Sequence, residues 1–323
     1  MKRGMFISMS LVLAAAAIAQ ALAQAPAPEA RGLPQRLGDT GFADPAVVRE
    51  RIEFTPRYPL WSDGATKKRW LWLPPGNTID ASNPDAWVFP RGTKLWKEFA
   101  HGDAVETRYI ERGADGRWRF GSYVWNAGHT EALLAPSSGL RDLPAPQAPG
   151  GRYGIPAEND CRACHEGAPV PVLGFSAMQL PTELRALVAE GKLRNLPDEL
   201  LAKPPVIAGP ARERAALGYL HGNCGHCHND DGPLAVLELN LSQRIQAAPD
   251  AVRRSIVGVP SQLRAGSVPP GTPRIQPGHV SASVVALRMN SRDPLQEMPP
   301  LGTSLVDAEG MALLAEWITS LDP

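Results

Sequence analysis

The spacing of hydrophobic residues changes along the chain, from a strand-like alternation in the first half to a helical period in the second. Strand-length runs rich in aromatic and β-branched side chains lie at 66–73, 93–100, 104–112 and 117–125. The glycine of Ala114-Asp115-Gly116, between the last two runs, can supply the positive φ that a hairpin turn needs. The pattern predicts a β-sandwich-like domain over residues 34–136.

Three later segments space their apolar residues as helices do: 182–190, 211–221 and 307–321. Asp307 begins the last of them and is a candidate N-cap. Between the strand-like and helical parts, the segment 137–151 is rich in proline, glycine and serine, which is typical of a linker. The expected fold class is therefore multidomain α+β, with the β domain followed by a mainly α-helical region.

Seven of the eight tryptophans lie in the predicted β domain: Trp61, Trp70, Trp72, Trp87, Trp96, Trp118 and Trp125. Such a cluster suits either an aromatic platform for sugars or a partner protein, or the core of a β domain. Trp70 and Trp72 share one face of a predicted strand and alternate with Leu71 and Leu73, which favours burial. We expect the cluster to form a core.

The N-terminus has the pattern of a secretory signal peptide. Lys2 and Arg3 precede an apolar stretch over 5–19, and Ala21-Leu22-Ala23 has the small-x-small pattern of a cleavage site. We expect a signal peptide over 1–23, a flexible lead-in over 24–33 and a periplasmic location. An uncleaved anchor is the alternative. No later apolar stretch has membrane length, so no stable membrane insertion is expected after cleavage.

Charge argues against one class of partner. The chain has 33 basic and 33 acidic residues, and loss of Lys2 and Arg3 with the signal peptide leaves 31 against 33, a net charge of −2. A nucleic-acid binder or a protein held on an anionic membrane surface would carry a basic excess. We therefore expect no nucleic-acid partner.

All four cysteines lie in two C-x-x-C-H runs, Cys161-Arg162-Ala163-Cys164-His165 and Cys224-Gly225-His226-Cys227-His228. Two thiols at this spacing can each form a thioether with a haem vinyl group, and the adjacent histidine can bind the iron as proximal ligand. The motifs predict two covalently bound haem c groups, each attached through the two cysteines of its run and ligated by the histidine.

Three other uses of the cysteines fit the spacing less well. Two disulfides, with three possible connectivities, would leave the adjacent histidines unexplained. A zinc ribbon separates its C-x-x-C runs by about 15 to 20 residues, whereas 59 residues lie between Cys164 and Cys224. A thioredoxin-like redox pair needs a βαβ pattern, which neither run has.

From residue 211 to the C-terminus, the order of parts resembles class I cytochrome c. A helix bearing Gly218-Tyr219 is followed by the second C-x-x-C-H run, by Met298-Pro299-Pro300 and by a C-terminal helix with Trp317. The resemblance implies that the first and last helices cross closely at a small and an aromatic residue, and that Met298 is the distal iron ligand. Histidine–methionine ligation suits an electron carrier. Because Met298 lies 70 residues beyond His228, we expect inserted residues around 260–277.

The distal ligand of the first haem stays open. Met178 is the methionine available in the first haem-binding segment, 152–210, but a core position in its apolar run is an equal alternative. His101 and His129 could reach it from the β domain, although lone loop histidines are usually solvated.

Other methionines and histidines have plainer interpretations. Met289 and Met311 fall in helical patterns, where methionine is more often a core residue. His226 occupies a variable position of its motif and is expected to point outward, and His279 is expected at a cap or on the surface.

Most of the mature chain resembles a family of secreted bacterial haem proteins that join a Trp-rich β domain to one or two C-x-x-C-H modules. The matching stretches are Tyr58–Ala65, Val88–Thr93, Tyr123–Asn126 and Met298–Ile318. This resemblance implies the architecture, with a class I cytochrome c-like domain over 211–323, but no substrate.

The expected function is a periplasmic dihaem cytochrome that transfers electrons between redox partner proteins, such as a dehydrogenase and a terminal acceptor. A dihaem peroxidase or oxidase is the alternative, because the first haem has no assigned distal ligand. A third hypothesis makes the β domain a recognition module that docks the cytochrome on a polymer or a partner enzyme.

Overall fold

A computed structural model of the protein describes residues 32–263 and 268–322. The predicted mixed α+β class is confirmed, and the chain divides into two compact units. The β unit takes the chain up to Phe54 together with Gly64–Thr78 and Phe89–Arg162, and the helical unit takes Thr55–Asp63, Ile79–Val88 and the chain from Ala163 onward. The predicted signal peptide over 1–23 and nearly all of the lead-in over 24–33 lie outside the described residues.

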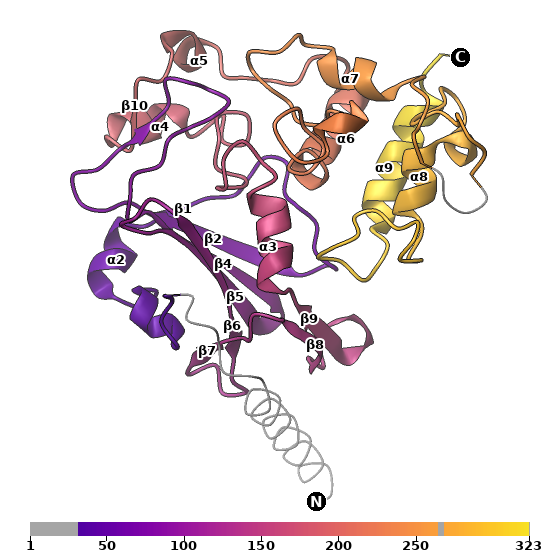
Figure 1. Cartoon of the computed structure of the whole chain (residues 1–323). Helices are drawn as coiled ribbons and strands as arrows, with labels where there is room; N and C mark the ends of the chain where they lie inside the picture. The colour runs from indigo at the N-terminus through magenta and orange to yellow at the C-terminus, as the bar shows by residue number, and fades with distance from the viewer. Residues whose placement is uncertain (1–31, 264–267, 323) are drawn as a thin grey trace, which may run out of the picture. The chain divides into compact units, whose positions relative to one another are not determined.

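An antiparallel sheet forms the centre of the β unit (Figure 1), and its strand order is β1-β2-β4-β5-β6-β7. Its strands are β1 (Ile52–Glu53), β2 (Thr66–Trp72), β4 (Lys94–His101), β5 (Asp103–Arg112), β6 (Trp118–Trp125) and β7 (Ala132–Leu134). The four predicted strand runs are thus confirmed as β2, β4, β5 and β6. Gly116, in the turn between β5 and β6, has a φ of 83°, as the predicted hairpin requires.

One face of the sheet carries a row of aromatic side chains across three neighbouring strands. Trp70 pairs with Trp96, and Trp96 pairs with Tyr109, so their side chains share a face. The Trp96 and Tyr109 ring centroids lie 5.5 Å apart, and both side chains are fully buried. The short helices η1 (Leu37–Thr40) and α2 (Pro45–Glu50) contribute Leu37 and Val47 to this core. The interpretation as a core of the β domain is therefore confirmed for Trp70 and Trp96. Trp87 is also buried, at 3% exposed, but it lies in the helical unit, where its ring contacts Phe175.

The opposite face of the sheet packs against a hairpin of β8 (Leu140–Pro144) and β9 (Arg152–Ile155), with η2 (Pro149–Gly151) between them. Burial alternates along β9, so Tyr153 and Ile155 point inward, where they meet Phe99 and Val124 of the sheet. The expected linker at 137–151 therefore contains a strand. Its proline and glycine residues form the turns of the hairpin. The full second sheet of a sandwich is not confirmed.

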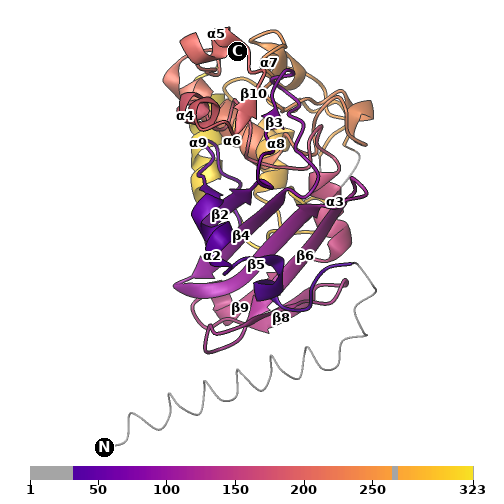
Figure 2. The same ribbon diagram turned by 90° about the vertical axis from the view of Figure 1, so that its left-hand side faces the viewer.

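Short helices and loops make up the helical unit (Figures 1 and 2). Its elements are β3 (Ile79–Asp80), α4 (Leu184–Ala189), β10 (Leu193–Arg194), α5 (Asp198–Ala202), α6 (Ala211–Asn223), η3 (Ala235–Leu237), α7 (Ala251–Ile256), η4 (Val280–Ala282), α8 (Val284–Met289) and α9 (Ala308–Thr319). The predicted helices correspond to α4, α6 and α9. Asp307 caps α9 as predicted, because its Oδ1 accepts a hydrogen bond from the Gly310 amide at 2.9 Å.

Helices α6 and α9 cross closely, at a glycine of one and a tyrosine of the other. A Cβ on Gly310 would lie within 2.5 Å of Tyr219 Cε2, so only glycine allows this approach. The Tyr219 hydroxyl donates to Asp307 Oδ2 at 2.9 Å, and Trp317 Nε1 donates to Glu213 Oε2 at 3.2 Å. The small residue of the crossing therefore lies on the last helix and the aromatic one on the first.

Two segments that sequence analysis assigned to the β domain, Thr55–Asp63 and Ile79–Val88, belong to the helical unit. The Trp61 amide donates to Asn223 Oδ1 at 2.7 Å, and both Asp63 carboxylate oxygens accept from the Ser304 amide at 2.9 and 3.0 Å. Strand β3 pairs in parallel with β10. No helix of the described chain has both the length and the apolar character needed to cross a bilayer.

Candidate haem-attachment site

The first C-x-x-C-H run ends helix α3 (Glu158–His165). Asp160 Oδ2 accepts the Ala157 amide at 2.9 Å at the start of the helix, and Arg162 Nη2 donates to Glu158 Oε1 at 2.9 Å along it. Acidic residues in the first turn favour the helix because they lie near its positive end. Cys161 and Cys164 are three residues apart on this helix and so lie on one face of it.

His165 is oriented by a backbone acceptor. Its Nδ1 lies 2.6 Å from the carbonyl oxygen of Pro171, and this geometry requires the proton on Nδ1. The lone pair is then on Nε2, which is the nitrogen that a proximal iron ligand offers. A hydrogen bond from the other ring nitrogen is the usual way in which a ligating histidine is held.

The second run continues from helix α6 as a helical turn. The amides of Cys227 and His228 donate to the carbonyl oxygen of Cys224 at 3.1 and 2.9 Å. This turn brings Cys224 and Cys227 to the same side of the backbone. Desolvation raises the pKa of the Cys224 thiol to about 12, so this thiol stays protonated at neutral pH.

His228 is 6% exposed, and its environment keeps the imidazole neutral. Burial lowers its pKa to about 4, with the Arg288 guanidinium as the second cause. Within the described part of the chain, its buried Nδ1 has no hydrogen-bond partner. A neutral ring is the form that binds a metal ion.

Asn229, which follows His228, connects the two runs. Its Nδ2 donates to the carbonyl oxygen of Gly167 at 2.9 Å and to those of Gly225 and His226 at 3.1 Å each. Its Oδ1 accepts the amides of Asp231 and Gly232 at 3.0 and 2.8 Å. The side chain is 1% exposed. Sequence analysis missed this residue, because an asparagine after a motif has no distinctive spacing.

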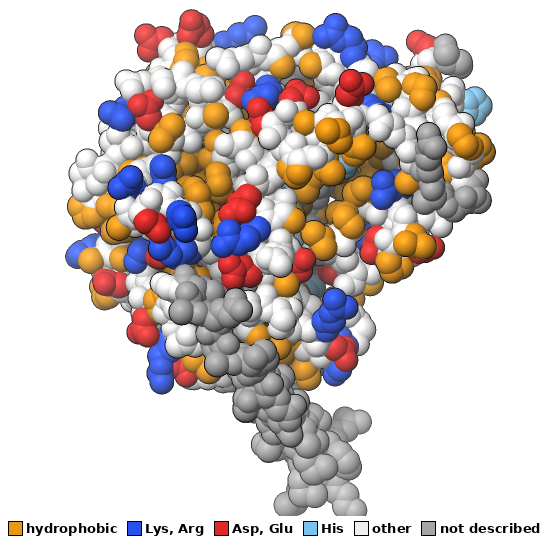
Figure 3. Space-filling model, in the orientation of Figure 1, with side chains coloured by type: hydrophobic (Ala, Val, Ile, Leu, Met, Phe, Trp, Pro, Cys, Tyr) orange, Lys and Arg blue, Asp and Glu red, His pale blue; other side chains and the backbone are white. Residues whose placement is uncertain are grey.

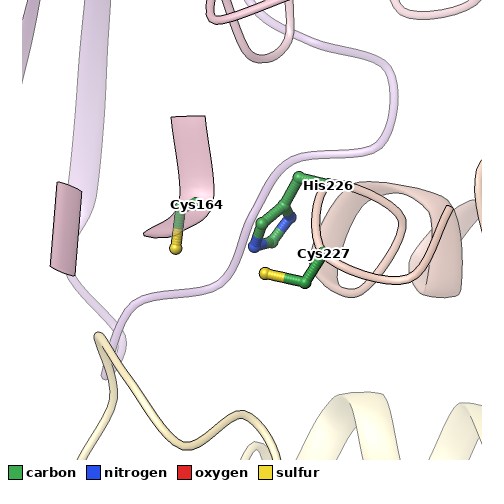
Figure 4. A group of neighbouring side chains, drawn as sticks. All are labelled: Cys164, His226 and Cys227. Carbon is green, nitrogen blue, oxygen red and sulfur yellow. The ribbon is translucent and has the colours of Figure 1, made fainter. Parts of the chain in front are cut away.

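The side chains of Cys164, His226 and Cys227 come together although two of them belong to the second run (Figure 4). One sulfur or nitrogen atom from each lies within 4.8 Å of the others. The hydrogen bond with Cys227 raises the pKa of Cys164 to about 12 and lowers that of Cys227. The expectation that His226 points outward was wrong: the ring is half-buried and faces the two sulfurs, because the first run packs against its side of the turn.

Met298 lies half-buried in a loop that two arginines hold. Its amide donates to the Arg288 carbonyl oxygen at 3.1 Å, and its own carbonyl oxygen accepts Arg292 Nη2 at 3.3 Å. The Arg288 guanidinium also donates to the carbonyl oxygens of Gln296 and Glu297, at 2.9 and 3.3 Å. The same guanidinium lowers the pKa of His228. Arg288 therefore holds the Met298 loop and also acts electrostatically on His228.

The other methionines are core residues of the helical unit. Met178 and Met289 are 7% and 6% exposed in one hydrophobic cluster with Leu217, and Met311 packs against the same cluster. The core interpretation of Met289 and Met311 agrees with this packing. The burial of Met178 favours its core alternative, and its role as a ligand stays a prediction.

The remaining histidines lie in different surroundings. His101 ends β4 and its ring contacts Tyr153 with centroids 5.8 Å apart, whereas His129 and His279 are exposed. His221 Nδ1 accepts the Gln243 amide at 3.1 Å, which places the proton on Nε2. Burial lowers the pKa of His221 to about 4.

Both runs fit a covalently attached haem in the chemistry of their donors. Each offers two thiols on one side of a helical turn and a histidine with a nitrogen suited to iron. Comparisons with models of protein families, with curated proteins and with solved structures found no match.

Proposed function

We propose that the protein is a periplasmic dihaem c-type cytochrome that transfers electrons between redox partner proteins. One observation supports this most directly: the same local geometry occurs twice, with two cysteines on one helical turn and a histidine immediately after them. All four cysteines and both motif histidines then have a use. Each thiol would add across one haem vinyl group, with sulfur bonding to the inner carbon and the proton going to the outer carbon, so that no oxidant would be consumed.

Each of the two C-x-x-C-H runs would hold one haem. Cys161 and Cys164 would attach one haem with His165 as proximal ligand, and Cys224 and Cys227 would attach the other with His228. The bound haems would supply a one-electron couple between ferric and ferrous iron. A neutral His228 can bind iron without first losing a proton, because burial already keeps it unprotonated.

Met298 is the proposed distal ligand of the second haem. Its thioether would favour ferrous iron and raise the reduction potential relative to a second histidine. The three backbone contacts around Arg288 support this role, since they fix the Met298 loop to a residue whose guanidinium acts electrostatically on His228. The crossing of α6 and α9 at Gly310 and Tyr219 also fits a class I cytochrome c-like arrangement. A second sheet layer of a β-sandwich remains a proposal.

The charge distribution supports protein partners and argues against nucleic acid. Lys and Arg side chains alternate with Asp and Glu side chains over the described part of the face in Figure 3. A redox partner would then recognise a local surface and not a large field of one sign. Of the tryptophans that could bind a polymer, Trp70, Trp87 and Trp96 are buried, which weakens the recognition-module hypothesis.

The test is expression in a host that matures c-type cytochromes, followed by haem counting. Intact mass and the pyridine haemochrome spectrum should give two haems per chain. Replacing both cysteines of either run by alanine should leave one. Two haems lost together, or a wild-type protein without covalent haem, would contradict the proposal.

Optical and EPR spectra distinguish electron transfer from the peroxidase or oxidase alternative. A carrier should have both irons low-spin and six-coordinate, and Met298→Ala should make the second iron high-spin while Met178→Ala should change only stability. If one wild-type iron is high-spin, binds carbon monoxide and turns over peroxide, the alternative is correct.

The cluster of Cys164, His226 and Cys227 favours a second candidate function, a transition-metal site. Two sulfurs and an imidazole are ligands that Zn²⁺ accepts. Such a site would leave Cys161, Cys224 and both motif histidines unused, so we rank it below haem attachment. Metal analysis of haem-free protein would test it, and stoichiometric zinc that survives dialysis would support it.

A further inference from the structure

We propose that Cys164 and Cys227 attach the two haems at adjacent corners, so that the haems form one magnetically and electrostatically coupled pair, and that Asn229 is the positioning residue that holds the two attachment runs together. This inference rests on the proposed function. It starts from one distance: the sulfur atoms of Cys164 and Cys227 lie within 4.8 Å of each other.

Covalent chemistry turns this distance into a limit on the separation of the haems. A thioether sulfur is two bonds from the ring carbon of the macrocycle, a span of about 3 Å. Two macrocycles bonded to sulfurs within 4.8 Å of each other therefore have edges about 11 Å apart or less. Cys161 and Cys224 set no comparable limit. The second cysteine of each run is thus the one that faces the other haem.

The two runs meet through the backbone, and not only through the thiols. The Asn229 amide joins the Gly167 carbonyl oxygen, two residues beyond His165, to the carbonyl oxygens of Gly225 and His226 inside the second run. A Cβ on Gly232 would lie 2.5 Å from the Gly167 oxygen, so the chain after the second run also passes close to the first. Cys227 Sγ lies 3.9 Å from the Ala163 oxygen.

Asn229 is suited to this role because its side chain contacts five backbone groups while it is almost completely buried, with the two Nδ2 hydrogens shared among three carbonyl oxygens. A buried amide with all its hydrogen bonds made has one orientation, since any other would leave polar groups unpaired. It therefore fixes the loop after the first run against the turn of the second.

A matched control is present in the same unit. Asn223 is a second buried asparagine beside the second run, and it connects that run to the backbone of Pro59 and Trp61. Replacing Asn223 should cost stability of the same kind without releasing the first run from the second.

The experiment is an EPR-monitored redox titration of the full-length holoprotein. In a coupled pair, the EPR signal of each ferric haem changes when the neighbouring haem is reduced, because the added electron pairs with the neighbour's unpaired electron. We expect the EPR spectrum of the half-reduced protein to differ in line shape and relaxation rate from the signal that the remaining ferric haem contributes to the fully oxidised spectrum. We also expect each haem to be reduced at a lower potential when the other is already ferrous.

Spectra that are simple sums of two independent haems at every potential would overturn the inference and leave the proposed function intact. A haem count below two per chain would instead contradict the proposed function itself. In Asn229→Ala the shape change and the difference in relaxation rate should fall at least twofold, while in Asn223→Ala they should stay as in the wild type. Equal effects in the two variants would overturn the role of Asn229.

Because Asn229→Ala could prevent haem loading, Gly232→Ala is the second variant. Its new methyl group would push the Gly167 carbonyl oxygen away, while the Asn229 side chain and its four hydrogen bonds within and just after the second run remain. It should bind two haems and still show weaker coupling than the wild type. Coupling unchanged in a fully loaded Gly232→Ala protein would show that contact between the runs does not set the haem separation.

Discussion

Substitution of Gly310 by alanine tests the helix crossing on which the helical unit depends. In an exposed helix this change is stabilising, because alanine has the higher helix propensity, by about 1 kcal/mol. Here the added Cβ would lie 2.5 Å from Tyr219 Cε2 and closer still to the end of the ring. The Tyr219 ring must therefore move, and we expect Gly310→Ala to destabilise the protein although alanine favours the helix.

The cost follows from what the Tyr219 ring holds. Its hydroxyl donates to Asp307 Oδ2, and the other oxygen of the same carboxylate caps α9 at the Gly310 amide. Overpacking typically costs about 1 to 3 kcal/mol. A lost hydrogen bond to a charged group costs about 1.5 to 3 kcal/mol. With the gain in helix propensity subtracted, the net loss of stability should be about 1.5 to 5 kcal/mol.

Urea unfolding of the holoprotein, followed by far-UV circular dichroism and haem absorbance, measures this loss. Ala312→Gly, at an exposed position of the same helix, calibrates the propensity difference and should cost about 1 kcal/mol. In a Tyr219→Leu background, where the ring is gone, Gly310→Ala should become neutral or stabilising. If Gly310→Ala stabilises the wild type as much as it stabilises Tyr219→Leu, the close contact between Gly310 and the Tyr219 ring is refuted.

Three further predictions concern charge. Glu106 is fully buried and accepts Arg108 Nε at 2.9 Å, so Glu106→Ala should cost about 3 kcal/mol in thermal unfolding. Glu131 is half-buried and pairs with the exposed Arg36, so Glu131→Ala should cost less than about 1 kcal/mol. The pKa of His221 falls from 6.5 to about 4 on folding. As the pH falls, His221 is therefore protonated in the unfolded chain before it is protonated in the folded chain, and acid destabilises the folded protein. From pH 7 to 5 the wild type should lose about 2 kcal/mol more than His221→Asn; equal losses would contradict this. Arg288→Gln should lower the potential of the second haem by tens of millivolts in a redox titration, because a nearby cation favours ferrous iron.

Local features of the fold could be predicted because local chemistry determines them. The alternation along β2, β4, β5 and β6 is decided within each strand, and the φ of Gly116 is decided within its turn. Asp307 was recognised as a cap because a capping carboxylate needs only the next three residues. These predictions did not depend on where the rest of the chain lies.

The linker prediction at 137–151 shows where composition misleads. Proline and glycine mark turns, but they do not show whether a strand lies between them. Leu143 is buried against the sheet with Tyr153 of the partner strand, and this hairpin is stabilised by the face it covers. The segment Thr55–Asp63 could not be assigned from pattern either, because its partners, Asn223 and Ser304, are far away in the sequence.

The residues proposed to hold the cofactors follow from spacing alone, whereas the way in which the two runs meet does not. The C-x-x-C-H spacing specifies a helical turn and a ligand, and both are local properties of each run. The 59 residues between Cys164 and Cys224 allow almost any separation of the two sites. The approach of Cys164 to Cys227 is set instead by Asn229 and by glycines at 167 and 232, which carry no chemistry of their own. For this reason the outward orientation expected for His226 was wrong: a variable position of one motif became the contact surface for the other.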